Sequence, residues 1–207
     1  LVWSVNSTVS DVSFGDTIHV IAGPCTIKEE IATRRYIISP NAFFQTNSHA
    51  APILLKTVEE FADDLSKKTV LDLYCGTGFF AIALAARAKR TIGIEMMSEA
   101  IADARINATK NAVNIECIDA KTEDSPWWTH KADVVILDPP RSGMHDNAFR
   151  DLLANPPETI VYVSCNPKNF AREMVQLARL YRVDEMRAID MFPHTPHVEL
   201  VTRLVRR

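Results

Sequence analysis

The sequence predicts an α/β protein with a mostly parallel sheet covered by helices on both faces, preceded by a short β segment. From Pro52 onward, segments of β-forming residues alternate with segments of helical apolar spacing, which is typical of such sheets. The last two expected strands differ, because only the short Pro-rich turn PHTP separates them. That turn is too short for a parallel crossover, so the last strand is expected to run antiparallel to its neighbour.

The elements of the α/β region follow from residue spacing. Apolar residues at helical spacing predict helices at 52–65, 79–88, 98–112, 147–154 and 168–181. Short runs of β-branched and aromatic residues predict strands at 69–74, 91–95, 114–118, 133–138, 159–164, 183–192 and 197–205. Ser98 precedes one helical pattern and is expected to cap it.

The first 38 residues have the pattern of short β segments divided by turns. Gly15-Asp16 and Gly23-Pro24 are turn signals within this stretch, and RYIIS closes it. We assign residues 1–51 to the tail of an upstream β domain with a connecting segment, and residues 52–207 to the α/β domain. The chain begins with Leu1 rather than Met, so we expect it to be a piece of a longer protein.

Charge and cysteine content narrow the functional classes. A net charge of -3 gives no electrostatic signature of nucleic-acid binding, so an RNA role must rest on other features. No signal peptide or membrane-spanning run is present, and we expect a cytoplasmic monomer with no membrane partner. The cysteines form no C-x-x-C pair, so we expect no metal site and no disulfide framework; they are Cys25, Cys75, Cys117 and Cys165.

The turn LDLYCGTGFFA has the features of a cofactor-binding loop. Gly76 and Gly78 allow the backbone to turn tightly against a ligand, and Glu95 ends the next strand, where an acid can bind a ribose hydroxyl pair. Asp72 and Tyr74 fit a pocket for S-adenosylmethionine. The turn also satisfies the loose G-x-G-x-x-A dinucleotide pattern, so NAD binding stays open at this point.

The stretch LDPPR follows the expected strand 133–138. Two prolines after Asp138 stiffen a loop at the strand's carboxyl end, where ligands of open α/β sheets bind. An NAD site gives no reason for this tetrapeptide. Nucleic-acid amino-methyltransferases hold their target amine with a similar tetrapeptide, but Arg141 replaces the aromatic residue that stacks on the base there.

Cys165 ends another strand and lies just before an expected helix. Asn166 is a suitable N-cap and Pro167 a suitable first helical residue, so the helix end is expected to favour the reactive thiolate. If the last strand lies antiparallel beside the Cys165 strand, its beginning brings Glu199 opposite the thiol. A nucleophile and a general base would then share one cleft.

These residues resemble the S-adenosylmethionine-dependent RNA uracil-5-methyltransferases. The matching stretches run in family order from Ile38 to the C-terminus, namely ISPNAFFQTN, LDLYCGTG, LDPPRSGM, YVSCNP and MFPHTPHVEL. The resemblance implies a Rossmann-like seven-stranded methyltransferase sheet with an antiparallel last strand, with Cys165 as nucleophile and Glu199 as base. It also implies that the cofactor is contacted by Gly76 of the turn and by Gln45, Tyr74, Glu95 and Asp138.

The chain departs from the family pattern in two ways. Phe79 stands where many members carry Asn, so a contact to the methionine end of the cofactor is lost or replaced. The family also usually carries an upstream iron–sulfur cysteine cluster and often a small RNA-binding β-barrel, and these residues contain neither.

The resemblance implies methyl transfer from S-adenosylmethionine to carbon 5 of a uridine in RNA, through a covalent Cys165 adduct. We expect ribosomal RNA as the substrate rather than transfer RNA. The alternatives are a nucleic-acid amino-methyltransferase, an NAD-linked oxidoreductase and a non-catalytic, cofactor-binding RNA scaffold. None of them requires a thiol facing a carboxylate.

Overall fold

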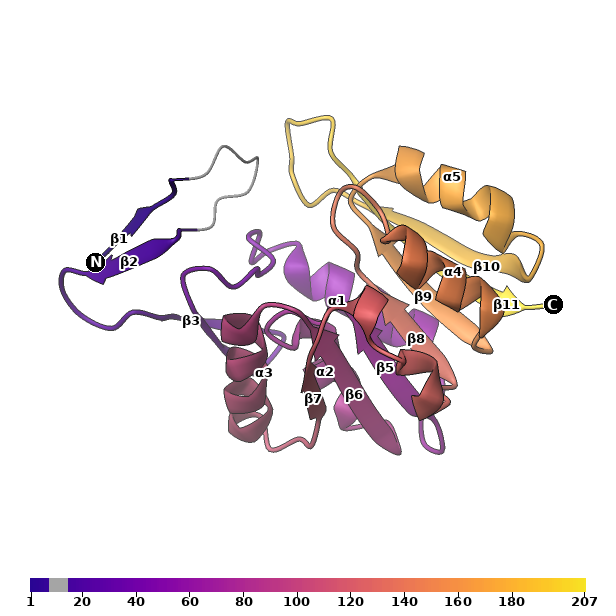
Figure 1. Ribbon diagram of the computed structural model, residues 1–207, viewed down its shortest axis with the longest axis horizontal. Coiled ribbons are helices and arrows are strands. Elements are labelled where there is room, and N and C mark those ends of the chain that lie inside the picture. Colours follow the sequence, from indigo (N-terminus) through magenta and orange to yellow (C-terminus); the bar gives the residue numbers. More distant parts are fainter. Residues whose placement is uncertain (8–14) are drawn as a thin grey trace.

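A seven-stranded sheet forms the centre of the computed structural model, which describes residues 1–7 and 15–207 (Figure 1). Its strands are β5 Thr69–Leu73, β6 Arg90–Glu95, β7 Glu116–Asp119, β8 Val134–Leu137, β9 Thr159–Ser164, β10 Tyr181–Ile189 and β11 Glu199–Arg206. They lie in the order β10-β11-β9-β8-β5-β6-β7. The predicted α/β fold is confirmed.

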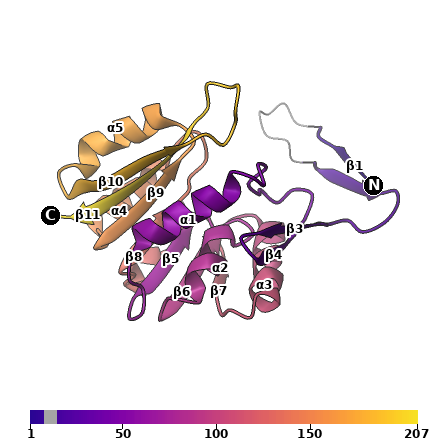
Figure 2. The same cartoon turned by 180° about the vertical axis from the view of Figure 1, so that it is seen from behind.

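Helices cover both faces of this sheet (Figures 1 and 2). One face carries α1 Ala51–Ala62, α2 Phe79–Ala85 and α3 Ser98–Lys110. The other carries α4 Asp146–Ala154 and α5 Pro167–Leu177, with two short 3-10 helices that the sequence did not predict, η1 Thr122–Asp124 and η2 Trp127–His130. In the described residues, no helix is long and apolar enough to cross a membrane.

The strand order confirms the predicted reversal at the C-terminus. β11 lies between β9 and β10 and is antiparallel to both, whereas β5, β6, β7, β8 and β9 pair in parallel. The loop between β10 and β11 is short, so β11 begins at the same edge of the sheet at which β10 ends. The start of β11 therefore lies beside the end of β9.

The N-terminal region forms two small antiparallel sheets. One pairs β1 Val2–Val5 with β2 Thr17–Val20, and this hairpin extends away from the main body (Figure 1). The other pairs β3 Ile27–Ile31 with β4 Arg34–Ile38, and it buries Ile31, Tyr36 and Ile38 in the core beneath α1 and α2. The expected β pattern is confirmed there, while positions 8–14 of it lie outside the described residues.

Several helix ends differ from the predictions by a few residues, and two of these differences have a clear physical cause. Ser98 is the first residue of α3 and does not cap it, because Met97 occupies the N-cap position and the Glu95 carboxylate accepts a hydrogen bond from its N–H at 2.8 Å. Helix α5 ends at Leu177 rather than 181. Tyr181 instead begins β10, where its ring is buried and its hydroxyl donates to the carbonyl of Pro157 at 2.9 Å.

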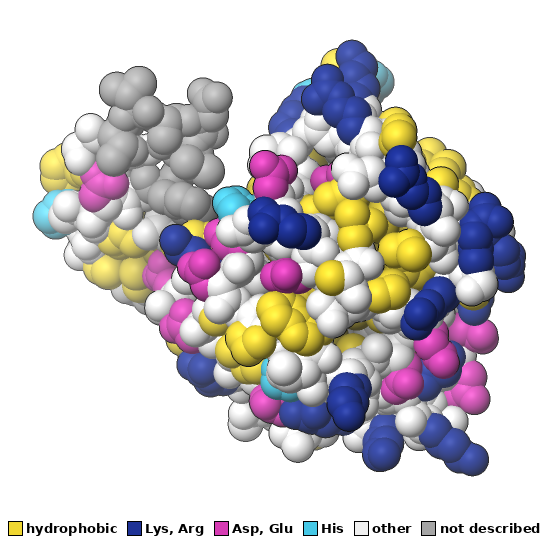
Figure 3. All heavy atoms as spheres, turned by 45° about the vertical axis from the view of Figure 1, so that its right-hand side comes forward, with side chains coloured by type: hydrophobic (Ala, Val, Ile, Leu, Met, Phe, Trp, Pro, Cys, Tyr) yellow, Lys and Arg dark blue, Asp and Glu magenta, His cyan; other side chains and the backbone are white. Residues whose placement is uncertain are grey.

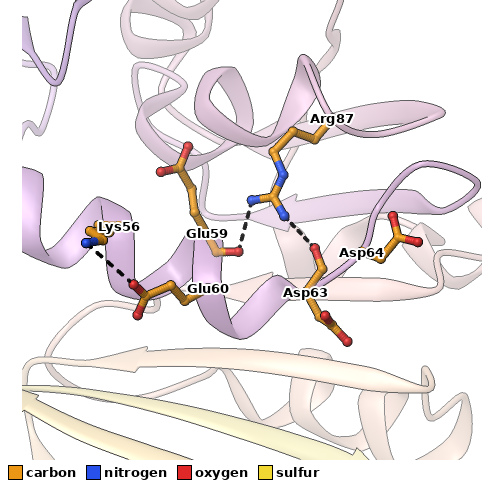
Figure 4. A pocket seen from close by; sticks show the side chains of 6 residues that line it. All are labelled: Lys56, Glu59, Glu60, Asp63, Asp64 and Arg87. Carbon is orange, nitrogen blue, oxygen red and sulfur yellow. Dashed lines mark hydrogen bonds and ion pairs between the residues drawn. The ribbon is translucent and has the colours of Figure 1, made fainter.

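A pocket of about 540 Å³ lies at the end of α1 (Figure 4). Several of its charged side chains form ion pairs, namely Lys56 with Glu60, Glu59 with Arg34 and Asp63 with Arg203. Arg87 donates to the backbone carbonyls of Glu59 and Asp63. The C-terminal end of α1 leads into the start of β5, so this pocket lies at the amino-terminal edge of the sheet. Ligands of open α/β sheets bind at the opposite edge.

Candidate active site

The carboxyl-terminal edge of the sheet gathers four titratable side chains on one face. Val70, Ile136, Val163 and Val201 all pack in the core beneath α1 and α2. Because side chains alternate along a strand, the positions two residues nearer this edge project from the same face. Those positions are Asp72, Asp138, Cys165 and Glu199.

Strand register places Glu199 opposite Cys165. Leu200 of β11 pairs with Ser164 of β9 in the antiparallel ladder, so the next pair of positions is Glu199 and Cys165. Directly opposite residues in such a ladder lie close enough for their side chains to interact. Glu199 is only 6% exposed, and its Oε2 atom has no hydrogen-bond partner within the described residues. A buried carboxylate oxygen thus remains available beside the thiol.

The electrostatics of this cluster favour protonated groups. Burial and the nearby carboxylates of Glu199 and Asp138 raise the pKa of the Cys165 thiol, and the Arg141 guanidinium opposes that rise. Burial raises the pKa of Glu199 to about 7. Burial, with Glu199 and Asp72 nearby, raises the pKa of Asp138 well above its usual range. Burial likewise raises the pKa of Asp72 to about 8.

The raised thiol pKa corrects one prediction from the sequence. The start of α5 was expected to favour the thiolate, but a helix end contributes only about 0.3–1 kcal/mol at exposed sites. Desolvation beside two carboxylates acts in the opposite direction and dominates here. The Cys165 thiol must therefore lose its proton before the sulfur can react.

The start of α5 has a second role that the sequence did not indicate. Asn166 occupies the N-cap position, but its side chain makes no cap hydrogen bond. Instead, Nδ2 of Asn166 and Nδ2 of Asn169 both donate to the carbonyl of Arg141, at 3.1 and 2.8 Å. Farther along α5, Glu173 accepts hydrogen bonds from the Met144 N–H and the Tyr162 hydroxyl. The helix that follows Cys165 thus fixes the loop that follows Asp138.

The glycine turn has the tight geometry that its sequence predicts. Gly76 and Gly78 have φ values of 53° and 86°, in the left-handed region that favours glycine. Glu95 accepts a hydrogen bond from the Gly76 N–H at 3.0 Å, and Asp72 accepts one from the Ala81 N–H at 2.9 Å. Two acids from adjacent strands therefore hold the turn and the beginning of α2.

Gln45 and Tyr74, the other two predicted cofactor residues, border this turn. Tyr74 follows β5 directly and has a φ of 67°, which is uncommon for a residue with a side chain. Gln45 is buried and lines a pocket of about 620 Å³ between its loop and the N-terminal strands. The same loop passes close to the turn, since the Phe43 carbonyl lies 3.6 Å from the position that a Cβ of Gly76 would take.

This edge has the polar groups that S-adenosylmethionine requires. Glu95 keeps acceptor capacity beyond its two backbone hydrogen bonds, because a carboxylate has about four lone-pair sites. The Oδ1 atom of Asp72 is buried without a hydrogen-bond partner among the described residues. Acceptors of this kind suit ribose hydroxyls and a positively charged amino group.

Comparison with known proteins gives the same family as the sequence resemblance. The tRNA (uracil-5-)-methyltransferase family matches residues 120–207, and a general methyltransferase domain matches residues 70–155. The tRNA (uracil(54)-C(5))-methyltransferase of Pyrococcus horikoshii is 45% identical over 98% of this chain and 48% of the relative. The chain belongs to the RNA uracil-5-methyltransferase family.

Two other matches support this family membership. A crystal structure of the tRNA (uracil-54, C5)-methyltransferase of Pyrococcus abyssi, in complex with S-adenosyl-L-homocysteine, superposes with a TM-score of 0.84 at 44% identity, over 99% of this chain and 50% of that one. An uncharacterised RNA methyltransferase of Caldanaerobacter subterraneus is 43% identical over 95% of this chain and 44% of the relative. The chain spans about half the length of the curated relatives it matches.

The departure from the family pattern at Phe79 has a structural explanation. The Phe79 ring is buried and packs at 5.8 Å from Tyr36 and 5.5 Å from Phe44, measured between ring centroids. The Tyr36 hydroxyl also donates to the Phe79 carbonyl at 3.3 Å. At this position the chain therefore has an aromatic contact that joins the start of α2 to the β4 strand and to the loop that carries Gln45.

No group of three or more metal-ligating side chains occurs among the described residues.

Proposed function

We propose that this chain transfers a methyl group from S-adenosylmethionine to carbon 5 of a uridine in transfer RNA, through a covalent adduct on Cys165. The observation that carries the proposal is the register of β11 on β9, which places a buried carboxylate, Glu199, opposite that thiol. The relatives' names support transfer RNA rather than the ribosomal RNA that we expected from the sequence.

The chemistry of uracil explains why a thiol and a carboxylate are both needed. Carbon 5 of the ring is too weak a nucleophile to accept a methyl group unaided. After the Cys165 thiol gives its proton to water, addition of the thiolate to carbon 6 forms a carbon–sulfur bond. The electron pair of the carbon 5–carbon 6 double bond moves toward carbon 5, and one difficult step is divided into two. S-adenosylmethionine supplies the electrophilic methyl group.

Glu199 acts as the base in this proposal. Its pKa of about 7 lies near neutral pH, which suits a group that must both accept and release a proton. After methylation, the Glu199 carboxylate takes the proton from carbon 5, the carbon 5–carbon 6 double bond re-forms, and the Cys165 thiolate leaves carbon 6. The target base must first be unstacked to reach the thiol, as in other enzymes that act on a base.

The residues around the glycine turn would hold the cofactor. Glu95 would accept hydrogen bonds from the ribose hydroxyls, and the left-handed turn at Gly76 would bring the backbone close to the ligand. Gln45, Tyr74 and Asp138 would complete the pocket. The division of the chain at residue 51 and a monomeric state are also part of this proposal.

Nucleoside analysis provides the direct test. An unmodified transfer-RNA transcript is incubated with the purified chain and S-adenosylmethionine, digested, and analysed by mass spectrometry for 5-methyluridine. We expect 5-methyluridine with the wild-type chain and none with Cys165→Ala. Methylated cytidine or adenosine instead would support an amino-methyltransferase. Undiminished 5-methyluridine from Cys165→Ala would refute the covalent mechanism.

A further inference from the structure

Helix α5 presents a row of cations to solvent. Lys168, Arg172 and Arg179, the last just beyond the helix end, are all exposed, and so is Val175 between them. Lys168, Arg172, Val175 and Arg179 follow one another at intervals of four, three and four residues. This spacing places them on one side of a helix with 3.6 residues per turn. We call Lys168, Arg172 and Arg179 the α5 row. From its first to its last residue the row extends about 16 Å along the helix axis.

The positive charge of the α5 row is not neutralised within the described residues. None of its members forms an ion pair there, whereas many other arginines do, such as Arg182 with Asp184. The one acidic residue of α5 is Glu173, whose carboxylate is turned inward to the Met144 N–H and the Tyr162 hydroxyl. The solvent-facing side of α5 therefore carries charge of one sign.

The α5 row begins next to the candidate nucleophile. Lys168 is three residues from Cys165 in sequence, in the first turn of the helix that starts after the thiol. The exposed Arg141 lies at the same end, because Asn166 and Asn169 hold its carbonyl. In Figure 3, Lys and Arg side chains are spread around the margin of the face that is turned forward, with some acidic side chains among them. Lys168 and Arg141 thus place two exposed cations near Cys165, in a chain of net charge -3.

We propose that the α5 row binds phosphate groups of the transfer-RNA substrate and guides the strand that carries the target uridine to Cys165. This inference rests on the proposed function and adds a binding surface to it. Exposed lysine and arginine side chains recognise the phosphate backbone without reading sequence. A single row along one helix suits one strand of the RNA, with the uridine at its Cys165 end.

A matched pair of triple variants tests this surface. The first is Lys168→Gln/Arg172→Gln/Arg179→Gln. The control, Lys67→Gln/Lys89→Gln/Lys110→Gln, removes the same charge from exposed lysines near the opposite edge of the sheet, none of them in an ion pair among the described residues. Transfer-RNA binding is titrated at several salt concentrations without S-adenosylmethionine. Circular dichroism melts verify that both variants fold.

We expect the α5-row variant to bind about tenfold or more weakly at low salt, and the slope of log K against log salt to fall by about 2 to 3, close to one for each lost phosphate contact. The control should change both quantities little. At saturating RNA, the α5-row variant should methylate at the wild-type rate, because the defect lies in binding.

Three outcomes would overturn the α5 row as an RNA surface: an unchanged salt slope in the α5-row variant, an equal loss in the control, or no salt-dependent binding by the wild-type chain. The proposed function fails separately. If the wild-type chain forms no 5-methyluridine while the salt slope still depends on the α5 row, the RNA surface stands and the reaction does not.

Discussion

The side-chain amide of Asn107 forms hydrogen bonds with both backbone polar groups of Ile37. Its Nδ2 atom donates to the Ile37 carbonyl at 3.0 Å, and its Oδ1 atom accepts from the Ile37 N–H at 2.6 Å. Nδ2 also reaches the carbonyl of Thr77 in the glycine turn, at 3.2 Å. The same face of α3 holds β4 and the residue after it through Asn111 on Arg35 and Asp103 on Ser39. Four residues of helix rise about 6 Å, which matches two residues of strand, about 6.6 Å.

Asn107→Ala is expected to destabilise the fold by about 3 kcal/mol, because it leaves partly buried backbone groups of Ile37 and the buried carbonyl of Thr77 without partners. Urea denaturation measures the loss. Asn111→Ala is the matched control, since Asn111 makes the same pair of bonds to Arg35 at a more exposed position. We expect it to cost about 1 kcal/mol or less. Equal losses would show that burial does not decide the cost.

Stability should depend on pH through Glu199. Burial raises its pKa from 4.5 to about 7, so the folded state favours the protonated carboxyl. That contribution is complete below about pH 4.5 and is lost as the pH rises through 7. Glu199→Gln should therefore match the wild type near pH 4 and exceed its stability at pH 8, by on the order of 2 kcal/mol.

Urea denaturation at the two pH values measures the Glu199 effect. Glu158→Gln removes an exposed glutamate and serves as the control. A wild type at least as stable as Glu199→Gln at pH 8 would mean that the carboxylate is stabilised by a partner when ionised.

Glu95 should be required for cofactor binding. Glu95→Ala removes both the expected ribose contact and the acceptor of the Gly76 and Met97 N–H groups. We expect S-adenosylhomocysteine affinity to fall about tenfold or more, since each lost hydrogen bond to a charged group contributes about 1.5–3 kcal/mol. Isothermal titration calorimetry measures this affinity, with Glu158→Ala, at an exposed position, as control. Heat from NAD and none from S-adenosylhomocysteine would support the alternative hypothesis that the glycine turn binds NAD.

The sheet and the placement of Glu199 opposite Cys165 could be predicted from the sequence, because both depend on local patterns. Alternating helices and strands specify the parallel sheet, and the short PHTP turn forces the reversal that brings Glu199 beside Cys165. Asp72 and Asp138 follow from alternation along buried strands. The roles of the predicted cofactor and catalytic residues stay predictions.

Side-chain contacts between distant segments could not be predicted in this way. Asn107 and Asn166 are polar residues at positions where a solvent-facing or capping role is the ordinary expectation. Their partners, Ile37 and the Arg141 carbonyl, are 70 and 25 residues away. The raised pKa of Cys165 likewise depends on acids from other strands. Only the assembled fold shows these neighbours.

The division of labour between Cys165 and Glu199 gives the sharpest prediction. Glu199→Gln keeps the shape of the side chain but cannot accept the proton from carbon 5 of the methylated ring. Addition of Cys165 to carbon 6 and methylation can proceed, whereas elimination cannot. We expect a transfer RNA that remains covalently joined to the chain, survives denaturation and migrates as a slow band on a gel. Cys165→Ala should form no such band, because it has no sulfur to add.

The methyl group and the proton distinguish this mechanism from its competitors. With S-adenosylmethionine labelled in its methyl group, the Glu199→Gln band should carry label, which shows that methylation preceded the block. With uridine tritiated at carbon 5, that variant should release tritium to water at least a hundredfold more slowly than the wild type, since general bases contribute about 10²–10⁴ in rate. Normal tritium release would assign the proton to another base, with His194 and His197 in the preceding loop as the next candidates. A Cys165→Ala chain that still methylates RNA would show that the thiol is not required, and it would favour the amino-methyltransferase hypothesis.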